Sequence, residues 1–131
     1  MSNERGTASL ELAIVAPVLM LLVLGVLQFG LWYHAQNVVQ AAALEGARVA
    51  AAEHGTAGAG KSRALEVVQE GLGDAADDQG ATASMGQESA RVQVTAQLAG
   101  LLPIPGLRSF SLSSEATVFR ERFRSAEDEQ Q

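Results

Sequence analysis

A single apolar segment near the N-terminus constrains this chain more than any other feature. Residues 12–27 contain no polar side chain, and Gln28 is the only strongly polar one before the segment ends at Tyr33. A helix of about 20 residues rises about 30 Å, which matches the hydrocarbon core of a bilayer. Because every backbone amide in lipid needs an internal partner, such a segment spans as a helix. We therefore predict a transmembrane helix over residues 12–33.

One carboxylate, Glu11, stands at the edge of this apolar segment. Insertion scales put an acidic side chain at mid-membrane at roughly 2.5–3.5 kcal/mol, and the value falls toward an end of the helix. A residue that is this unfavourable in lipid is a functional candidate by default. Residues 1–6, at the start of the chain, form a short polar leader, which ends in Gly6 and has Arg5 as its only basic side chain.

This arrangement resembles the cleavage region of type IV pilin precursors, in which a polar leader ends in Gly and a Glu is the fifth residue of the apolar helix. The resemblance implies a cut by a prepilin peptidase between Gly6 and Thr7, with Glu11 as fifth residue of the mature chain. Further landmarks, over about the first 52 residues, resemble the TadE family of pseudopilins from the tight-adherence (Tad) pilus. They are Gly6–Glu11, Ala16–Val18, Leu24–Gly25, Phe29–Gly30 and Ala42–Ala51. Two positions depart from the family pattern: Gln28, where an acidic residue is common, and Leu31, where a basic one is.

The resemblance implies a membrane-anchored pseudopilin that takes part in pilus assembly. Its partners would be membrane lipid, other Tad pilus or pseudopilin subunits and the prepilin peptidase, and Glu11 would pair with the N-terminus of a neighbouring subunit. It would cross the cell membrane once, with the N-terminus cytoplasmic and the C-terminal domain extracytoplasmic. The alternative is a single-pass anchor that displays a small extracytoplasmic binding domain without polymerising. A cleaved secretory signal fits less well, because its apolar region is usually 7–15 residues long and ends in a small-residue site.

Nothing in the sequence ends the helix after Tyr33. Residues 34–53 contain no proline and many alanines, the strongest helix formers, so we predict one helix over 7–53. Trp32 and Tyr33 are predicted to mark the outer membrane boundary, or else to pack on the soluble domain. A stripe of small residues in the outer half would face either this chain's own sheet or a neighbouring subunit; it consists of Val39, Ala42, Ala43, Gly46, Ala47 and Ala50. The residues assigned to helix packing are Pro17, Gly25, Gly30, Ala43, Gly46, Ala47 and Ala50.

The remaining residues, 54–124, are predicted to form one small α+β domain, followed by a disordered tail at 125–131. Leu65, Val68 and Leu72 form an apolar stripe of a short helix. Residues 71–88 contain almost no large apolar group and are predicted to be a loop. Residues 91–98 and 109–119 alternate between apolar and polar, which is typical of half-buried strands, and we expect them to pair in an antiparallel sheet.

The connection between these two strands, residues 99–108, is unusually apolar for a turn. It contains two prolines and four large aliphatic residues, Leu101, Leu102, Ile104 and Leu107. These side chains either tuck under the sheet or meet a partner subunit or the membrane surface.

The sequence carries little that points to catalysis or to a cofactor. Gly55–Ser62 satisfies the phosphate-loop pattern, but the motif needs a preceding strand and this segment follows a predicted helix, so we expect no nucleotide binding. Asp74, Asp77 and Asp78 lack the spacing of a calcium loop, and His34 and His54 lie in no metal-ligand pattern. The chain has no cysteine, and its net charge of −6 disfavours nucleic acid as a partner. We therefore expect no metal, no cofactor and no enzymatic activity.

Overall fold

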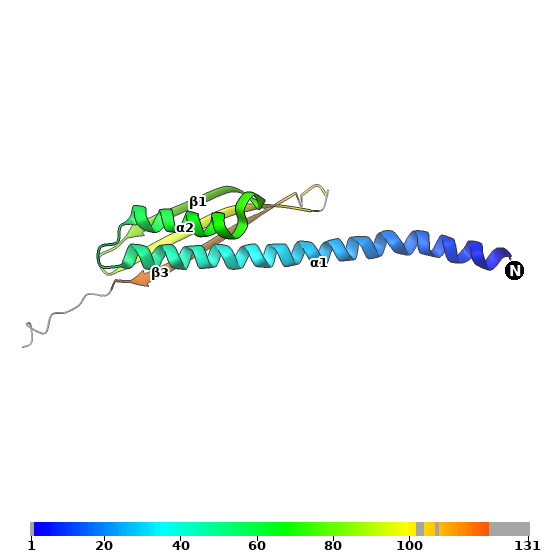
Figure 1. Ribbon diagram of the computed structural model, residues 1–131, viewed down its shortest axis with the longest axis horizontal. Coiled ribbons are helices and arrows are strands. Elements are labelled where there is room, and N and C mark those ends of the chain that lie inside the picture. The colour runs from blue at the N-terminus through cyan, green and yellow to red at the C-terminus, as the bar shows by residue number, and fades with distance from the viewer. Residues whose placement is uncertain (1, 102–103, 107, 121–131) are drawn as a thin grey trace, which may run out of the picture.

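The computed structural model describes residues 2–101, 104–106 and 108–120. Its elements in chain order are α1 (Ser2–Ala51), α2 (Ala57–Leu72), the 3₁₀ turn η1 (Gly73–Ala75), β1 (Ala76–Met85), β2 (Ser89–Ala99) and β3 (Ser109–Phe119). The N-terminal half of α1 projects alone, whereas its C-terminal half lies beside α2 on one face of the sheet (Figure 1). The predicted α+β class, with a long N-terminal helix, a second helix and an antiparallel sheet, is confirmed.

Helix α1 is 50 residues long and continues through Pro17 without interruption. The turn that follows it leads to Thr56, whose hydroxyl accepts a hydrogen bond from the Ala59 backbone N–H at 3.1 Å. This bond satisfies one of the donors left free at a helix start, which explains why α2 begins here. The helix ends at Leu72, where the N–H of Gly73 donates to the carbonyl of Gln69.

The sheet has three antiparallel strands in the order β1-β2-β3, so β2 is the central one. Val92 of β2 lies opposite Ala83 of β1 and Ala116 of β3. The predicted alternation is confirmed in β2, where Val92 and Val94 are buried and Arg91 and Gln93 are exposed. The exposed face is polar, as is common for an antiparallel sheet that is covered on one side only.

The core lies between that sheet and the two helices. We call the C-terminal half of α1 (residues 24–51), α2 and the sheet together the sheet domain. Most of its buried side chains are small, and its largest fully buried ones are Leu112, Val39, Val68, Val92 and Val94. Small side chains allow the elements to approach closely, so the domain gains its packing from short distances between backbones and less from bulky groups.

Two glycines bring the backbones of α1 and α2 close together. A Cβ atom on Gly46 of α1 would lie 2.7 Å from the carbonyl oxygen of Gly60 in α2. In return, a Cβ atom on Gly60 would lie 2.6 Å from the carbonyl oxygen of Gly46 and 2.7 Å from the Cβ of Ala50. The small-residue stripe of α1 therefore packs on this chain's own second helix and sheet, which decides between the two alternatives that the sequence left open.

The prediction of a loop over residues 71–88 is wrong, because this segment contains β1. The inward-facing residues of β1 are Ala76, Ala81 and Ala83, so the strand shows no contrast between large apolar and polar side chains. Its pairing with β2 also shifts register between Asp77 and Gly80, where Asp78 has a positive φ of 47°. A bulge of this kind interrupts the two-residue period on which strand prediction depends. The sheet consequently has one strand more than the two that were predicted.

Candidate membrane span and assembly segment

The apolar part of α1 is uncovered by the rest of the chain. Helix α1 is long and apolar enough to cross a membrane, and its most apolar window of 18 residues is 0% buried within the structure. Residues 6–23 are all exposed, Leu24 is half-buried, and the first buried residue is Gln28. A contiguous apolar surface of this size marks a membrane or a protein interface. The helix is thus compatible with a single membrane span.

The residues of the predicted cleavage region lie on this uncovered helix. Gly6, Thr7 and Glu11 are exposed and belong to α1. Among the side chains that the structure describes, none forms an ion pair with the Glu11 carboxylate; the ion pairs found join Arg and Glu side chains of the sheet domain. The Glu11 carboxylate is therefore not part of an ion pair within the described part of its own chain.

The glycines of α1 fall into two groups. A Cβ atom on Gly46 would clash with α2, whereas a Cβ atom on Gly6, Gly25 or Gly30 would meet nothing within 4 Å. Glycine in a helix interior is less favourable than alanine by about 1 kcal/mol. Packing inside the chain explains Gly46, but it does not explain the three glycines nearer the N-terminus.

The predicted helix-packing residues divide in the same way. Ala43, Ala47 and Ala50 are fully buried in the sheet domain. Pro17 and Gly30 are exposed, and Gly25 is half-buried at the edge of the domain. Only the N-terminal members therefore remain accessible to another molecule.

Gln28 is a contact residue that the sequence reasoning missed. Its side chain is only 7% exposed, and its Oε1 accepts a hydrogen bond from the backbone N–H of Leu101 at 2.6 Å. This bond ties α1 to the β2–β3 loop (residues 100–108). A signal was present in the sequence: Gln28 stands four and seven residues before Trp32 and Ala35, on the helix face that the domain covers.

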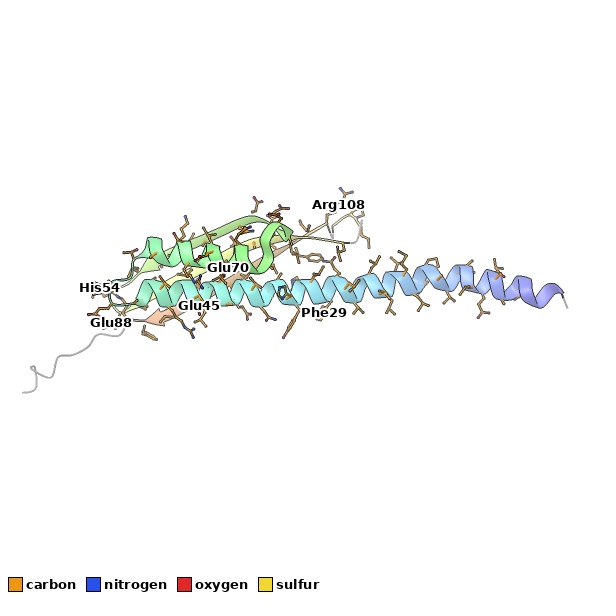
Figure 2. All side chains as sticks on the ribbon, in the orientation of Figure 1. Phe29, Glu45, His54, Glu70, Glu88 and Arg108 are labelled. Atoms are coloured by element: carbon orange, nitrogen blue, oxygen red, sulfur yellow. The ribbon has the colours of Figure 1, made fainter. Side chains whose placement is uncertain are left out.

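The aromatic residues after Gln28 face different surroundings. Trp32 is half-buried and packs against the core. This agrees with the second of the two predictions for Trp32, packing on the soluble domain. Tyr33 is 58% exposed, and its ring lies 6.5 Å from that of Phe29 between centroids. Phe29 points away from the sheet (Figure 2). One side of this part of α1 thus belongs to the domain and the other is open.

The two large aliphatic residues that the structure describes in the β2–β3 loop do not tuck under the sheet. Leu101 is 48% exposed and Ile104 is 42% exposed. Leu102 and Leu107 lie outside the described residues. The loop projects past the end of the sheet toward the N-terminal half of α1 (Figure 1). Leu101 and Ile104 are therefore available for contact with a partner or a membrane.

The phosphate-loop pattern has a packing explanation. Helix α1 precedes it, α2 begins inside it, and Gly60 is buried against Gly46.

Within the described residues no group of three or more His, Asp or Glu side chains is placed to hold a metal ion. The hydrogen bond to Glu66 raises the pKa of Arg63, so this surface guanidinium stays charged and does not titrate in the physiological range.

A comparison with known families matches the segment that contains the uncovered apolar helix, with Gly6 and Glu11 at its start. Residues 6–48 match the family model of TadE-like proteins. The resemblance to TadE predicted from the sequence is thereby confirmed for this segment. No curated protein and no solved structure matches the chain. The match ends inside α1, so α2 and the three strands lie outside the TadE-like segment.

The contact between the TadE-like helix and the loop leads to a prediction. Replacing Gln28 by leucine removes the acceptor for the Leu101 N–H, and a typical hydrogen bond contributes about 0.5–1.5 kcal/mol. We expect the amide of Leu101 to exchange its hydrogen up to about tenfold faster in the Gln28→Leu chain. Hydrogen exchange followed by mass spectrometry measures this rate.

The matched control is Gln40→Leu, the same change at an exposed position of α1. The Gln28→Glu chain keeps an acceptor and is expected to keep the protection of Leu101. Equal exchange in the Gln28→Leu and Gln40→Leu chains would contradict the contact.

Proposed function

We propose that this chain is a membrane-anchored pseudopilin that takes part in assembly of the Tad pilus. The observation that carries the proposal is an exposed carboxylate, Glu11, at the start of an uncovered apolar helix and five residues after Gly6. The match of residues 6–48 to TadE-like proteins supports it. In this proposal α1 crosses the cell membrane once, with its N-terminus in the cytoplasm and the sheet domain outside.

The first step is removal of the leader by a prepilin peptidase, which hydrolyses the peptide bond between Gly6 and Thr7. The new α-amino group of Thr7 is positively charged near neutral pH. When mature helices align in parallel, Glu11 of one subunit pairs with the Thr7 amine of its neighbour. A buried pair of opposite charges fixes the axial register of two helices, because any slip leaves both charges unpaired in an apolar surrounding.

The exposed part of α1 suits this kind of assembly. Gly25 and Gly30 leave the helix surface open, and small residues let two helices approach closely in a membrane. Large apolar side chains near these glycines, such as Val23, Val26 and Leu27, are more than half exposed. These groups would pack on lipid before assembly and on neighbouring helices after it.

The decisive experiment is to express the chain in membranes together with its prepilin peptidase and determine the N-terminal sequence. The mature chain is expected to begin at Thr7, because the polar leader ends in Gly6 immediately before the helix. Gly6→Leu is expected to block cleavage, since the resemblance places a glycine immediately before the cut.

Gly30→Leu is the matched control, because it makes the same change at another open glycine of the same helix. A mature chain that begins at Met1 or Ser2 in the presence of active peptidase would refute the processing step.

A second candidate function is a single-pass anchor that displays the sheet domain without polymerising. It is favoured by the packing of the small-residue stripe inside the chain, which leaves that part of α1 unable to bind a neighbour. This candidate requires no processing, and it predicts that substitution of Glu11 has no effect on function.

A further inference from the structure

We propose that Leu101 and Ile104 of the β2–β3 loop enter the outer margin of the bilayer beside α1, so that the sheet domain rests on the membrane. The proposal rests on the membrane span in the proposed function and goes beyond it, because a span alone does not place the domain. The ligand is the lipid surface itself, and the contacting residues are Leu101 and Ile104.

The first argument is the length of the span. A hydrocarbon core of about 30 Å takes about 20 helical residues, so a span that begins just after Glu11 ends near Leu31. Leu24 is already half-buried, and Gln28 is buried and hydrogen-bonded to Leu101. The last turn of the span, which begins at Gln28, therefore has the sheet domain on one side and lipid on the other.

The alternative placement of the span is unfavourable. Holding the whole domain clear of the hydrocarbon leaves only residues 12–27, about 24 Å of helix, between Glu11 and the first buried residue, Gln28. A full span would then have to move toward the N-terminus and take Glu11 into the apolar core. The insertion penalty of an acidic side chain opposes this shift, and it rises toward mid-membrane.

The loop has the chemistry that this position requires. Leu101 and Ile104 are large apolar side chains and about half exposed. The base of the loop is closed by a hydrogen bond of 2.7 Å from the Gly100 N–H to the Arg108 carbonyl, and Gln28 accepts from the next N–H. Backbone donors that enter the margin of a bilayer need partners of this kind. Arg108 is exposed, and a long cationic side chain near lipid can extend to the phosphate groups.

The two ends of the sheet domain differ accordingly. Arg108 marks the end nearer the N-terminal half of α1, whereas Glu88 lies at the opposite end (Figure 2). The turn between β1 and β2 at that opposite end carries Gln87, which is exposed. With the loop in the bilayer margin, this turn points away from the membrane, and the height of the domain above the bilayer is set by Gln28.

The test uses single-cysteine variants of the full chain, which is possible because the sequence contains no cysteine. Ile104→Cys, Gln87→Cys and Val18→Cys are labelled with the environment-sensitive fluorophore NBD. Each chain is placed in phosphatidylcholine–phosphatidylglycerol vesicles that contain lipids with a nitroxide quencher either near the headgroup or near the chain end. Emission wavelength and quenching then report the depth of each position.

The Ile104 probe is expected to shift its emission to the blue and to lose most of its intensity to the shallow quencher. The Gln87 probe is expected to emit as in water and to keep its intensity with both quenchers. The Val18 probe should be quenched by the deep nitroxide, which reports the span independently. An Ile104 probe that behaves like the Gln87 probe, in vesicles where Val18 is quenched, would overturn the loop contact and leave the span intact. A Val18 probe without quenching would overturn the span and the loop contact together.

Discussion

Replacing Gly60 by valine is expected to destabilise the sheet domain by about 3 kcal/mol, the upper part of the range for overpacking in a close-packed core. The new Cβ would lie 2.6 Å from the Gly46 carbonyl oxygen and 2.7 Å from the Ala50 Cβ. Neither atom can rotate away, so α1 and α2 must separate and lose contact along the buried stripe. With a total stability of about 5–15 kcal/mol for a typical domain, this loss is a large fraction.

Gly58→Val is the matched control for this substitution. It makes the same change two residues earlier in α2, where the nearest neighbour of the new Cβ is the Thr56 hydroxyl oxygen at 3.9 Å. Because valine has a higher helix propensity than glycine, this control is expected to be neutral or slightly stabilising. Urea unfolding of the full chain in detergent micelles, followed by the fluorescence of Trp32, measures both variants, since the chain has one tryptophan and it packs against the core. Equal midpoints for the two variants would show that the helices do not approach through Gly60.

Replacing Glu11 by alanine is expected to leave membrane insertion intact and to reduce pilus assembly more than about 100-fold. The reason is the proposed pair between Glu11 and the Thr7 amine of a neighbour. Removing one partner of a buried ion pair typically costs 3–5 kcal/mol, because the other charge is left without compensation. Insertion should persist because the substitution makes the helix more apolar. The measurement is the fraction of membrane-inserted chain that co-purifies with Tad pilus subunits.

Two further variants separate the charge from its surroundings. Glu11→Gln removes the charge at nearly constant shape and is expected to behave like Glu11→Ala. Leu10→Ala removes an exposed apolar side chain at the same level of the helix and is expected to assemble almost normally. Normal assembly of the Glu11→Gln chain would exclude the ion pair as the source of register.

The division of α1 into two halves has a consequence for any assembly of this protein. The stripe around Gly46 is occupied by α2 and the sheet, so it is not available for contacts between subunits, whereas the N-terminal half and the open face at Phe29 and Tyr33 are exposed. The sheet domain adds a polar sheet face, on which Arg91 and Glu115 form an ion pair of 3.5 Å. An exposed pair of this kind contributes little to stability, which leaves this face free for other contacts.

Local patterns in the sequence were sufficient for several features of this protein. The apolar segment, the charge at Glu11 and the order of the TadE-like landmarks are properties of neighbouring residues, and the family match agrees with them. Strands β2 and β3 were predictable because their large and polar side chains alternate. Helix α2 was predictable from the spacing of Val68 and Leu72, which are both buried.

Other features were decided only by the tertiary structure. β1 is a strand because β2 supplies its hydrogen-bonding partner and α2 covers its alanines, and neither cause can be read from its own residues. Gln28 is buried because a loop more than seventy residues away in sequence donates a hydrogen bond to it at 2.6 Å. The small-residue stripe could serve an internal or an external partner equally well, since small side chains permit close approach without specifying the partner. In each case the deciding contact joins segments that are far apart in the chain, so local sequence patterns do not predict it.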